Sequence, residues 1–165
     1  MSGLLRNFLT LLRALFSAGA AGTGARVTSW FWVTPFDAGT HVLKSDRYLQ
    51  LAEAAQLDYL VRTRLMGTLL RRRLSFVNAS QLVKFSRPIA MFKRVRVETA
   101  IIFADEKCAW FSHAMFVGAE EHAEVLVKMK FKKGSLTVRP AELINQDFAA
   151  KPAQLEAWDR ALDAM

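Results

Sequence analysis

The spacing of apolar residues changes once along this chain, and that change is what most limits its fold. From Arg47 to about Leu65, apolar side chains recur at the period of a helix with one buried face. After Gly67 they alternate with polar side chains as far as Lys133, which is the pattern of strands with one buried face. Consecutive strands without intervening helices favour antiparallel pairing. The sequence therefore predicts an α+β domain in which one long helix packs on an antiparallel sheet.

The predicted helix has a narrow apolar stripe. Its alanines keep the middle of the helix slim, so that a sheet can wrap closely around it. Ser45 or Asp46 is predicted to cap the first turn, because both side chains can accept hydrogen bonds from backbone N–H groups. The stripe consists of Tyr48, Leu51, Ala52, Ala55 and Tyr59.

Four long strands are predicted after this helix and one short strand before it. In the clearest of them, one face carries Val95, Val97, Thr99, Ile101 and Phe103. The predicted segments are Thr28–Val33, Arg73–Arg87, Arg94–Phe103, Ala109–Val117 and Val125–Phe131, and a short helix over Ala153–Ala164 ends the chain. This order resembles the hotdog fold, in which five or six strands wrap around a long central helix. The unpaired edges of such a sheet predict a homodimer or a tetramer.

The first residues have a different character. No acidic residue precedes Asp37, and Arg6 and Arg13 interrupt an apolar run that is too short and too charged to span a membrane. Residues 4–16 are predicted to form an amphipathic helix that contacts a membrane surface, serves as a targeting segment or packs on the protein itself. The predicted organisation is a helix and linker over 1–25, a hotdog domain over 26–145 and a C-terminal helix over 146–165.

The charge of the chain suggests an anionic partner. Lys and Arg outnumber Asp and Glu, which gives a net charge of +8. Nucleic acid fits poorly, because the charge is scattered and no helix-turn-helix, zinc-finger or aromatic RNA-binding pattern occurs. Three interpretations remain: a phosphate-bearing ligand such as coenzyme A, anionic lipid, or a solvated basic surface without a partner.

The number and spacing of the cysteine and histidine residues indicate the cellular compartment and whether a metal site is expected. Cys108 is the single cysteine, so an intramolecular disulfide cannot form and a reducing compartment is favoured. We therefore expect a cytoplasmic protein with a buried thiol, associated with a membrane if residues 4–16 bind lipid. The three histidines are scattered without metal-ligand spacing, so no metal site is expected.

Two motifs relate the chain to a known family. Residues 34–42 read TPFDAGTHV and are followed by Arg47-Tyr48-Leu49. This stretch resembles the start of the 4-hydroxybenzoyl-CoA thioesterase-like proteins, whose pattern is D-x-D-x-N-x-H-x-N-N-x-x-Y-L. Asp37 matches the second Asp of that pattern, and His41 matches its His. The run Phe85-Ser86-Arg87-Pro88-Ile89 likewise resembles the F-x-R-P-L that ends the family's second strand.

The resemblance implies hydrolysis of an acyl-CoA or acyl-carrier-protein thioester, with no cofactor beyond the coenzyme A of the substrate. Asp37 would act on the thioester carbonyl as nucleophile or as the base for water, and His41 would orient it or the substrate. Backbone N–H groups of Lys44 and Ser45 would hold the oxyanion, and Tyr48 would contact the substrate. Without the resemblance, a turn role for Asp37 and a backbone hydrogen bond for His41 are the simpler interpretations.

Departures from the family pattern keep two alternatives open. Pro35 replaces the first Asp, Gly39 replaces the Asn, and residues 43–46 stand where the paired Asn residues are expected. These changes favour a non-catalytic hotdog protein that binds an acyl thioester or a lipid. A hotdog hydratase would also use a carboxylate and a His. Its D-x-N-P-x-H pattern, however, places the His one residue farther from the Asp and includes a Pro.

Overall fold

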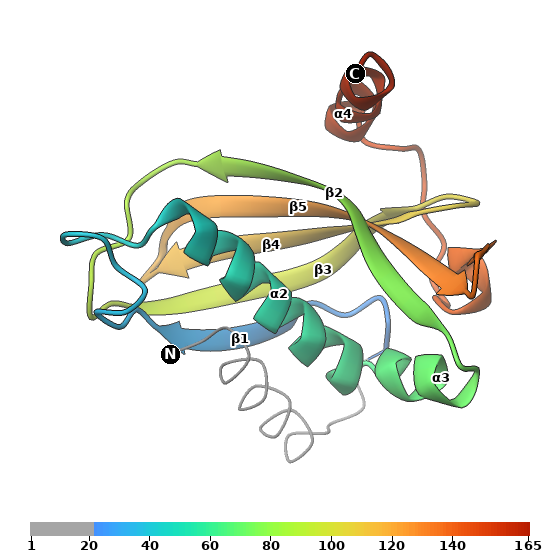
Figure 1. Ribbon diagram of the computed structural model, residues 1–165, viewed down its shortest axis with the longest axis horizontal. Coiled ribbons are helices and arrows are strands. Elements are labelled where there is room, and N and C mark those ends of the chain that lie inside the picture. The colour runs from blue at the N-terminus through green and yellow to red at the C-terminus, as the bar shows by residue number, and fades with distance from the viewer. Residues whose placement is uncertain (1–21) are drawn as a thin grey trace.

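A computed structural model describes residues 22–165 (Figure 1). The predicted membrane contact of residues 4–16, and most of the segment 1–25, lie outside the described residues. The elements in chain order are β1 (Val27–Trp32), α2 (Ser45–Arg62), α3 (Leu65–Arg71), β2 (Ser75–Phe85), β3 (Arg94–Ala104), β4 (Ala109–Val117), β5 (Glu120–Lys133), β6 (Leu136–Val138), a 3-10 turn (Pro140–Glu142) and α4 (Ala153–Asp163).

The strands form one antiparallel sheet with α2 lying across one face (Figure 1). Their order is β1-β3-β4-β5-β2, and the short β6 pairs with β5. The strands β3, β4 and β5 follow one another as hairpins, whereas β1 and β2 join at opposite sides of this meander. The predicted α+β class, with a sheet wrapped on one long helix, is confirmed.

The main core lies between α2 and the sheet. All five residues of the predicted apolar stripe are buried, and Ala52 and Ala55 are completely inaccessible to solvent. Their small side chains leave room for Val95 and Val97 of β3, which belong to the same cluster. Burial of a single leucine such as Leu51 stabilises the fold by roughly 1.5–3 kcal/mol. The slim middle of the helix is therefore a structural requirement of the wrapped sheet, as the sequence predicted.

The ends of α2 differ from the prediction. The helix begins at Ser45 after an N-cap at Lys44, and neither Ser45 nor Asp46 caps it, because both lie within the first turn. It ends at Arg62, since Arg64 has a left-handed backbone with φ of 62°. Gly67, after which the spacing predicted strands, lies inside the second helix, α3. The change to strand therefore comes at Ser75, later than predicted.

A β-bulge in β3 makes one part of the prediction wrong: Phe103 does not lie on the same face of the strand as Ile101. Val97, Thr99 and Ile101 are buried as the alternation predicts, but the register shifts between Ile101 and Phe103. Because a bulge inserts one residue, Phe103 turns to the other side of the sheet. There its ring lies 5.6 Å from that of Trp110. The predicted β5 was also too short, and β6 was not predicted.

The opposite side of the sheet is covered in part by α4, which was correctly predicted. Leu155 and Trp158 of α4 pack with Trp110 and Cys108 in a second apolar cluster. Cys108 is buried there, as predicted, and its burial raises the pKa of the thiol. Lys128 and Lys151 both donate to the carboxylate of Asp159, at 2.8 and 2.5 Å, which ties α4 to β5.

Candidate functional site

Two loops form one end of the molecule and hold the predicted site residues. The loop between β1 and α2 spans residues 33–44, and the loop between β2 and β3 spans 86–93. The backbone N–H of Leu43 donates to the carbonyl of Ile89 at 2.8 Å, and that of Met91 donates to the carbonyl of His41 at 2.9 Å. The two sequence motifs are therefore brought together by main-chain hydrogen bonds.

Asp37 is fully buried in a tight turn. Its N–H donates to the carbonyl of Thr34 at 2.9 Å, while its carboxylate oxygen Oδ2 accepts hydrogen bonds from the N–H of Thr34 at 3.1 Å and from its hydroxyl at 2.7 Å. Such reciprocal bonding is how an Asp stabilises a turn. The same bonds fix the direction of the carboxylate, which a positioned base or nucleophile also requires.

The start of α2 is tied directly to Asp37. The backbone N–H of Lys44 donates to the carbonyl oxygen of Asp37 at 3.1 Å. Of the two amides predicted to hold an oxyanion, that of Lys44 is therefore engaged within the loop. The N–H of Ser45 belongs to the first turn of α2, whose amides have no acceptor inside the helix and carry its partial positive charge.

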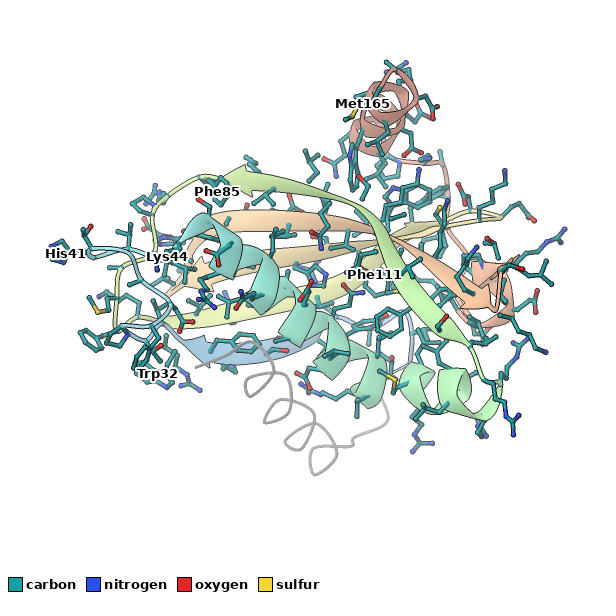
Figure 2. All side chains as sticks on the ribbon, viewed as in Figure 1. Trp32, His41, Lys44, Phe85, Phe111 and Met165 are labelled. Atoms are coloured by element: carbon teal, nitrogen blue, oxygen red, sulfur yellow. The ribbon has the colours of Figure 1, made fainter. Side chains whose placement is uncertain are left out.

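His41 occupies a different environment from Asp37. It lies in a turn closed by the N–H of Gly39, which donates to the carbonyl of Val42 at 2.9 Å. Its side chain is exposed, and Figure 2 shows it at the outer tip of the loop, beyond Lys44. In the described structure, the turn thus directs His41 toward solvent while Asp37 faces the interior.

Tyr48 links the two motifs. Its side chain is buried, and its ring meets that of Phe85 edge to face with centroids 5.0 Å apart. Burial raises the pKa of the Tyr48 hydroxyl, and a hydrogen bond with the backbone of Ile89 partly offsets this. Tyr48 thus packs the first turns of α2 against the end of β2 and the loop that follows it.

A cleft between α2 and β2 was not anticipated from the sequence. Its volume is about 260 Å³, and it is lined by Glu53, Gln56, Leu57, Phe76 and Asn78. Gln56 is buried, and its Nε2 donates to Oδ1 of Asn78 at 3.1 Å, while its Oε1 has no hydrogen-bond partner. Glu53 is an exposed carboxylate at the rim. The signal in the sequence was a glutamine one turn after Ala52, on the predicted apolar side of the helix.

The sheet also buries a histidine. His113 of β4 is fully buried, and its Nδ1 lies 3.0 Å from the hydroxyl of Thr99 on β3. Burial lowers the pKa of His113 to about 3, so the ring is neutral in the folded protein. Its Nε2 has no hydrogen-bond partner. Among residues 22–165, no three side chains of His, Cys, Asp or Glu gather as a metal site would need.

Comparison with known protein families shows which family the chain belongs to. The family model described as the thioesterase-like superfamily matches residues 31–151, which include both loops, α2 and the whole sheet apart from most of β1. The chain belongs to the thioesterase-like superfamily. No curated protein sequence matches this thioesterase-like chain.

Solved structures similar to the thioesterase-like chain have the hotdog fold. A probable thioesterase from Bartonella henselae is 21% identical with a TM-score of 0.61, covering 70% of this chain and 98% of its own. A mutant of 4-hydroxybenzoyl-CoA thioesterase in complex with 4-hydroxybenzoyl-CoA is 14% identical with a TM-score of 0.65, covering 73% and 96%. A DHNA-CoA thioesterase from Staphylococcus aureus is 14% identical with a TM-score of 0.62, covering 84% and 91%. The resemblance read from the two motifs is confirmed at the level of family and fold.

Proposed function

We propose that this chain hydrolyses the thioester of an acyl-CoA or acyl-carrier-protein substrate, with Asp37 as the acting carboxylate. The observation that carries the proposal is the position of Asp37, whose carboxylate is held by Thr34 while its carbonyl accepts the amide of Lys44, the residue just before α2. A thioester is activated enough for one oriented carboxylate to suffice. Superfamily membership supports the reaction class.

The proposed hydrolysis needs only water and the residues of the chain to account for every bond and proton. Asp37 takes a proton from water as the water oxygen bonds to the acyl carbon, or it attacks that carbon itself and water then resolves the acyl intermediate. The carbon–sulfur bond breaks, and the proton passes to the departing thiolate. The N–H of Ser45, at the positive end of α2, stabilises the oxyanion. Tyr48 contributes by fixing α2 against the second loop.

A homodimer is part of the proposal, and β2 is the edge through which it would form. Within residues 22–165 this strand pairs only with β5, and its exposed side chains include Val77, Leu82 and Phe85. An unpaired, apolar edge favours pairing with a second copy. Light scattering at micromolar concentration should report a dimer or a tetramer, and a stable monomer would contradict this part of the proposal.

The compartment proposed is the cytoplasm. The buried thiol of Cys108 and the absence of any other cysteine suit a reducing environment. None of the helices in the described part of the chain is long and apolar enough to cross a bilayer.

A second candidate is an acyl-thioester-binding protein without catalysis. The turn bonds of Asp37 and the outward direction of His41 both favour it, because each has a structural explanation that requires no reaction. The missing paired Asn residues at 43–46 favour it as well.

A screen of the purified chain against short, long and aromatic acyl-CoAs separates the two candidates. Release of free coenzyme A is followed with a thiol reagent, and binding of the same compounds is followed by calorimetry. The hydrolase proposal expects enzyme-dependent release for at least one compound. Saturable binding without release would establish the second candidate, and neither binding nor release would contradict both.

A further inference from the structure

One end of the molecule combines exposed aromatic rings with positive charge. We call it the loop pole and define it as residues 32–44 and 86–94. Its two segments are joined by the hydrogen bonds already described and by the N–H of Phe92, which donates to the carbonyl of Val33 at 2.9 Å. Figure 1 places both loops at one end of the longest axis of the molecule. The two segments of the loop pole are therefore one connected part of the surface.

Large apolar side chains of the loop pole face solvent. Trp32 is 63% exposed, Phe36 72% and Phe92 66%. Figure 2 shows Trp32 at the same end of the molecule as His41 and Lys44. Single exposed apolar residues are ordinary, but several aromatic rings on two joined loops indicate a surface that is covered by a partner.

The backbone of Phe92 strengthens this interpretation. Its φ is 64°, in the left-handed region where a bulky side chain is rare and costs free energy. Glycine would fit this turn without that cost. Phe92 therefore has a backbone conformation that glycine would adopt more easily, and its ring is exposed to water. Both costs are offset if the ring is buried against something outside the chain.

The charge of the loop pole indicates what that partner is. Its cations are Lys44, Arg87, Lys93 and Arg94, all exposed, and its single acid is the buried Asp37. Glu120 on β5 pairs with Arg87 at 2.6 Å, and the Arg94 guanidinium lies 4.2 Å above the ring of Trp30, itself exposed beside Trp32. Exposed cations on the same two segments as exposed Trp and Phe rings complement a surface that has an apolar interior and anionic groups at its boundary with water.

We propose that the loop pole docks on an anionic lipid bilayer. Aromatic rings insert at the level of the headgroups, while Lys and Arg contact lipid phosphates. Exposed rings on both joined loops, those of Phe36 and Phe92, suit a deformable surface. Docking there sets the loop that carries Asp37 at the membrane. The proposal does not require catalysis, and it concerns a surface separate from residues 4–16.

The proposal is tested on the full chain by co-sedimentation with vesicles of phosphatidylcholine, with and without about 30% phosphatidylglycerol. The test variant is Phe36→Ser/Phe92→Gly. Its matched control is Leu70→Ser/Leu136→Ser, which removes two leucines that are each 70% exposed outside the loop pole. We expect the wild type to pellet with phosphatidylglycerol vesicles and to be released by salt. The test variant should bind about tenfold more weakly and the control as the wild type does.

Charge and fluorescence give independent readouts. Lys93→Glu should weaken binding several-fold, whereas Lys107→Glu, an exposed lysine in the β3–β4 turn, should not. Brominated lipid should quench the emission of the exposed Trp30 and Trp32, and this quenching should disappear in Trp30→Phe/Trp32→Phe. Because glycine accepts the backbone of Phe92, the test variant should melt no lower than the control.

Three results would overturn the proposal. The wild type could fail to bind either kind of vesicle. The test variant could pellet as the wild type does, with unquenched Trp30 and Trp32, which would assign lipid binding to another part of the chain. The test variant could instead change the molecular mass in light scattering without any lipid effect, which would make the loop pole a contact between copies of the chain.

Discussion

Two polar regions along α2 differ in how their buried groups are satisfied. At the start of the helix, Asp37 is buried with hydrogen bonds from Thr34. Near the middle, Gln56 is buried with its Oε1 unpaired, beside the exposed carboxylate of Glu53. The first region is a completed structural unit, whereas the second is a cleft whose polar wall is incomplete. The buried Asp37 thus stabilises the turn and is also the residue proposed to act on the thioester, so stability and turnover have to be measured separately.

The largest effect on stability is expected from Asp37→Ala. The change removes both hydrogen bonds that the Asp37 side chain accepts from Thr34 and leaves a loop amide without its partner. The free energy of unfolding should fall by about 2–3 kcal/mol, measured by urea denaturation. Asp46→Ala, which removes an exposed carboxylate from the first turn of α2, should cost at most about 0.5 kcal/mol. Equal losses in the two variants would mean that the turn does not depend on Asp37.

A smaller effect is expected from the protonation of His113, which resembles Gln56 in having a buried atom without a partner. The pKa is about 3 in the folded protein and about 6.5 when unfolded, so below pH 6.5 the unfolded state binds a proton that the folded state does not. The contribution of the neutral His113 to the free energy of unfolding is thus fully present above about pH 6.5 and decreases as the pH falls below that value. Between pH 7 and pH 5 this group should remove about 2 kcal/mol from the free energy of unfolding.

Two variants isolate the contribution of His113. Urea denaturation at both pH values should give the full loss for His122→Asn, because this variant keeps the buried His113, and much less for His113→Asn. The same pH dependence in both variants would show that another group causes it.

The smallest effect is expected from Gln56→Leu. Replacing a buried amide that has an unpaired oxygen with an apolar side chain should raise the free energy of unfolding by about 1 kcal/mol. Asn78 is exposed and can bond with water instead. Gln50→Leu serves as the control, because Oε1 of Gln50 accepts a hydrogen bond from Arg47 at 2.6 Å and its loss should give no gain. A clear destabilisation by Gln56→Leu would mean that the assembled protein supplies a partner for Oε1.

The parts of the fold that follow from periodicity could be predicted from the sequence. The stripe from Tyr48 to Tyr59 and the alternation in β3 identify buried faces because the spacing is set by local geometry. The bulge after Ile101 could not be predicted, since an inserted residue leaves no periodic signal. The end of α2 was missed because it depends on the left-handed backbone of Arg64, a residue without a turn preference.

The candidate site was predictable only in part. The motifs identified Asp37 and the loop, but burial of Asp37 and exposure of His41 depend on the turn from Gly39 to Val42 and on the bond from Met91. The second of these is a contact between segments that are distant in the sequence, which a local pattern does not reveal. The cleft was missed for the same reason, because Gln56 meets Asn78 only when β2 folds back over α2.

The proposal that Asp37 is the acting carboxylate is tested most directly by comparing turnover in variants of Asp37 and Glu53. Asp37→Asn keeps an acceptor for Thr34, and Glu53→Gln changes the exposed carboxylate of the cleft, so both proteins should remain folded. With the acyl-CoA that the wild type hydrolyses fastest, kcat should fall by about a thousandfold in Asp37→Asn and change less than about threefold in Glu53→Gln. Undiminished turnover in Asp37→Asn, together with its loss in Glu53→Gln, would contradict the role proposed for Asp37 and assign the reaction to the cleft.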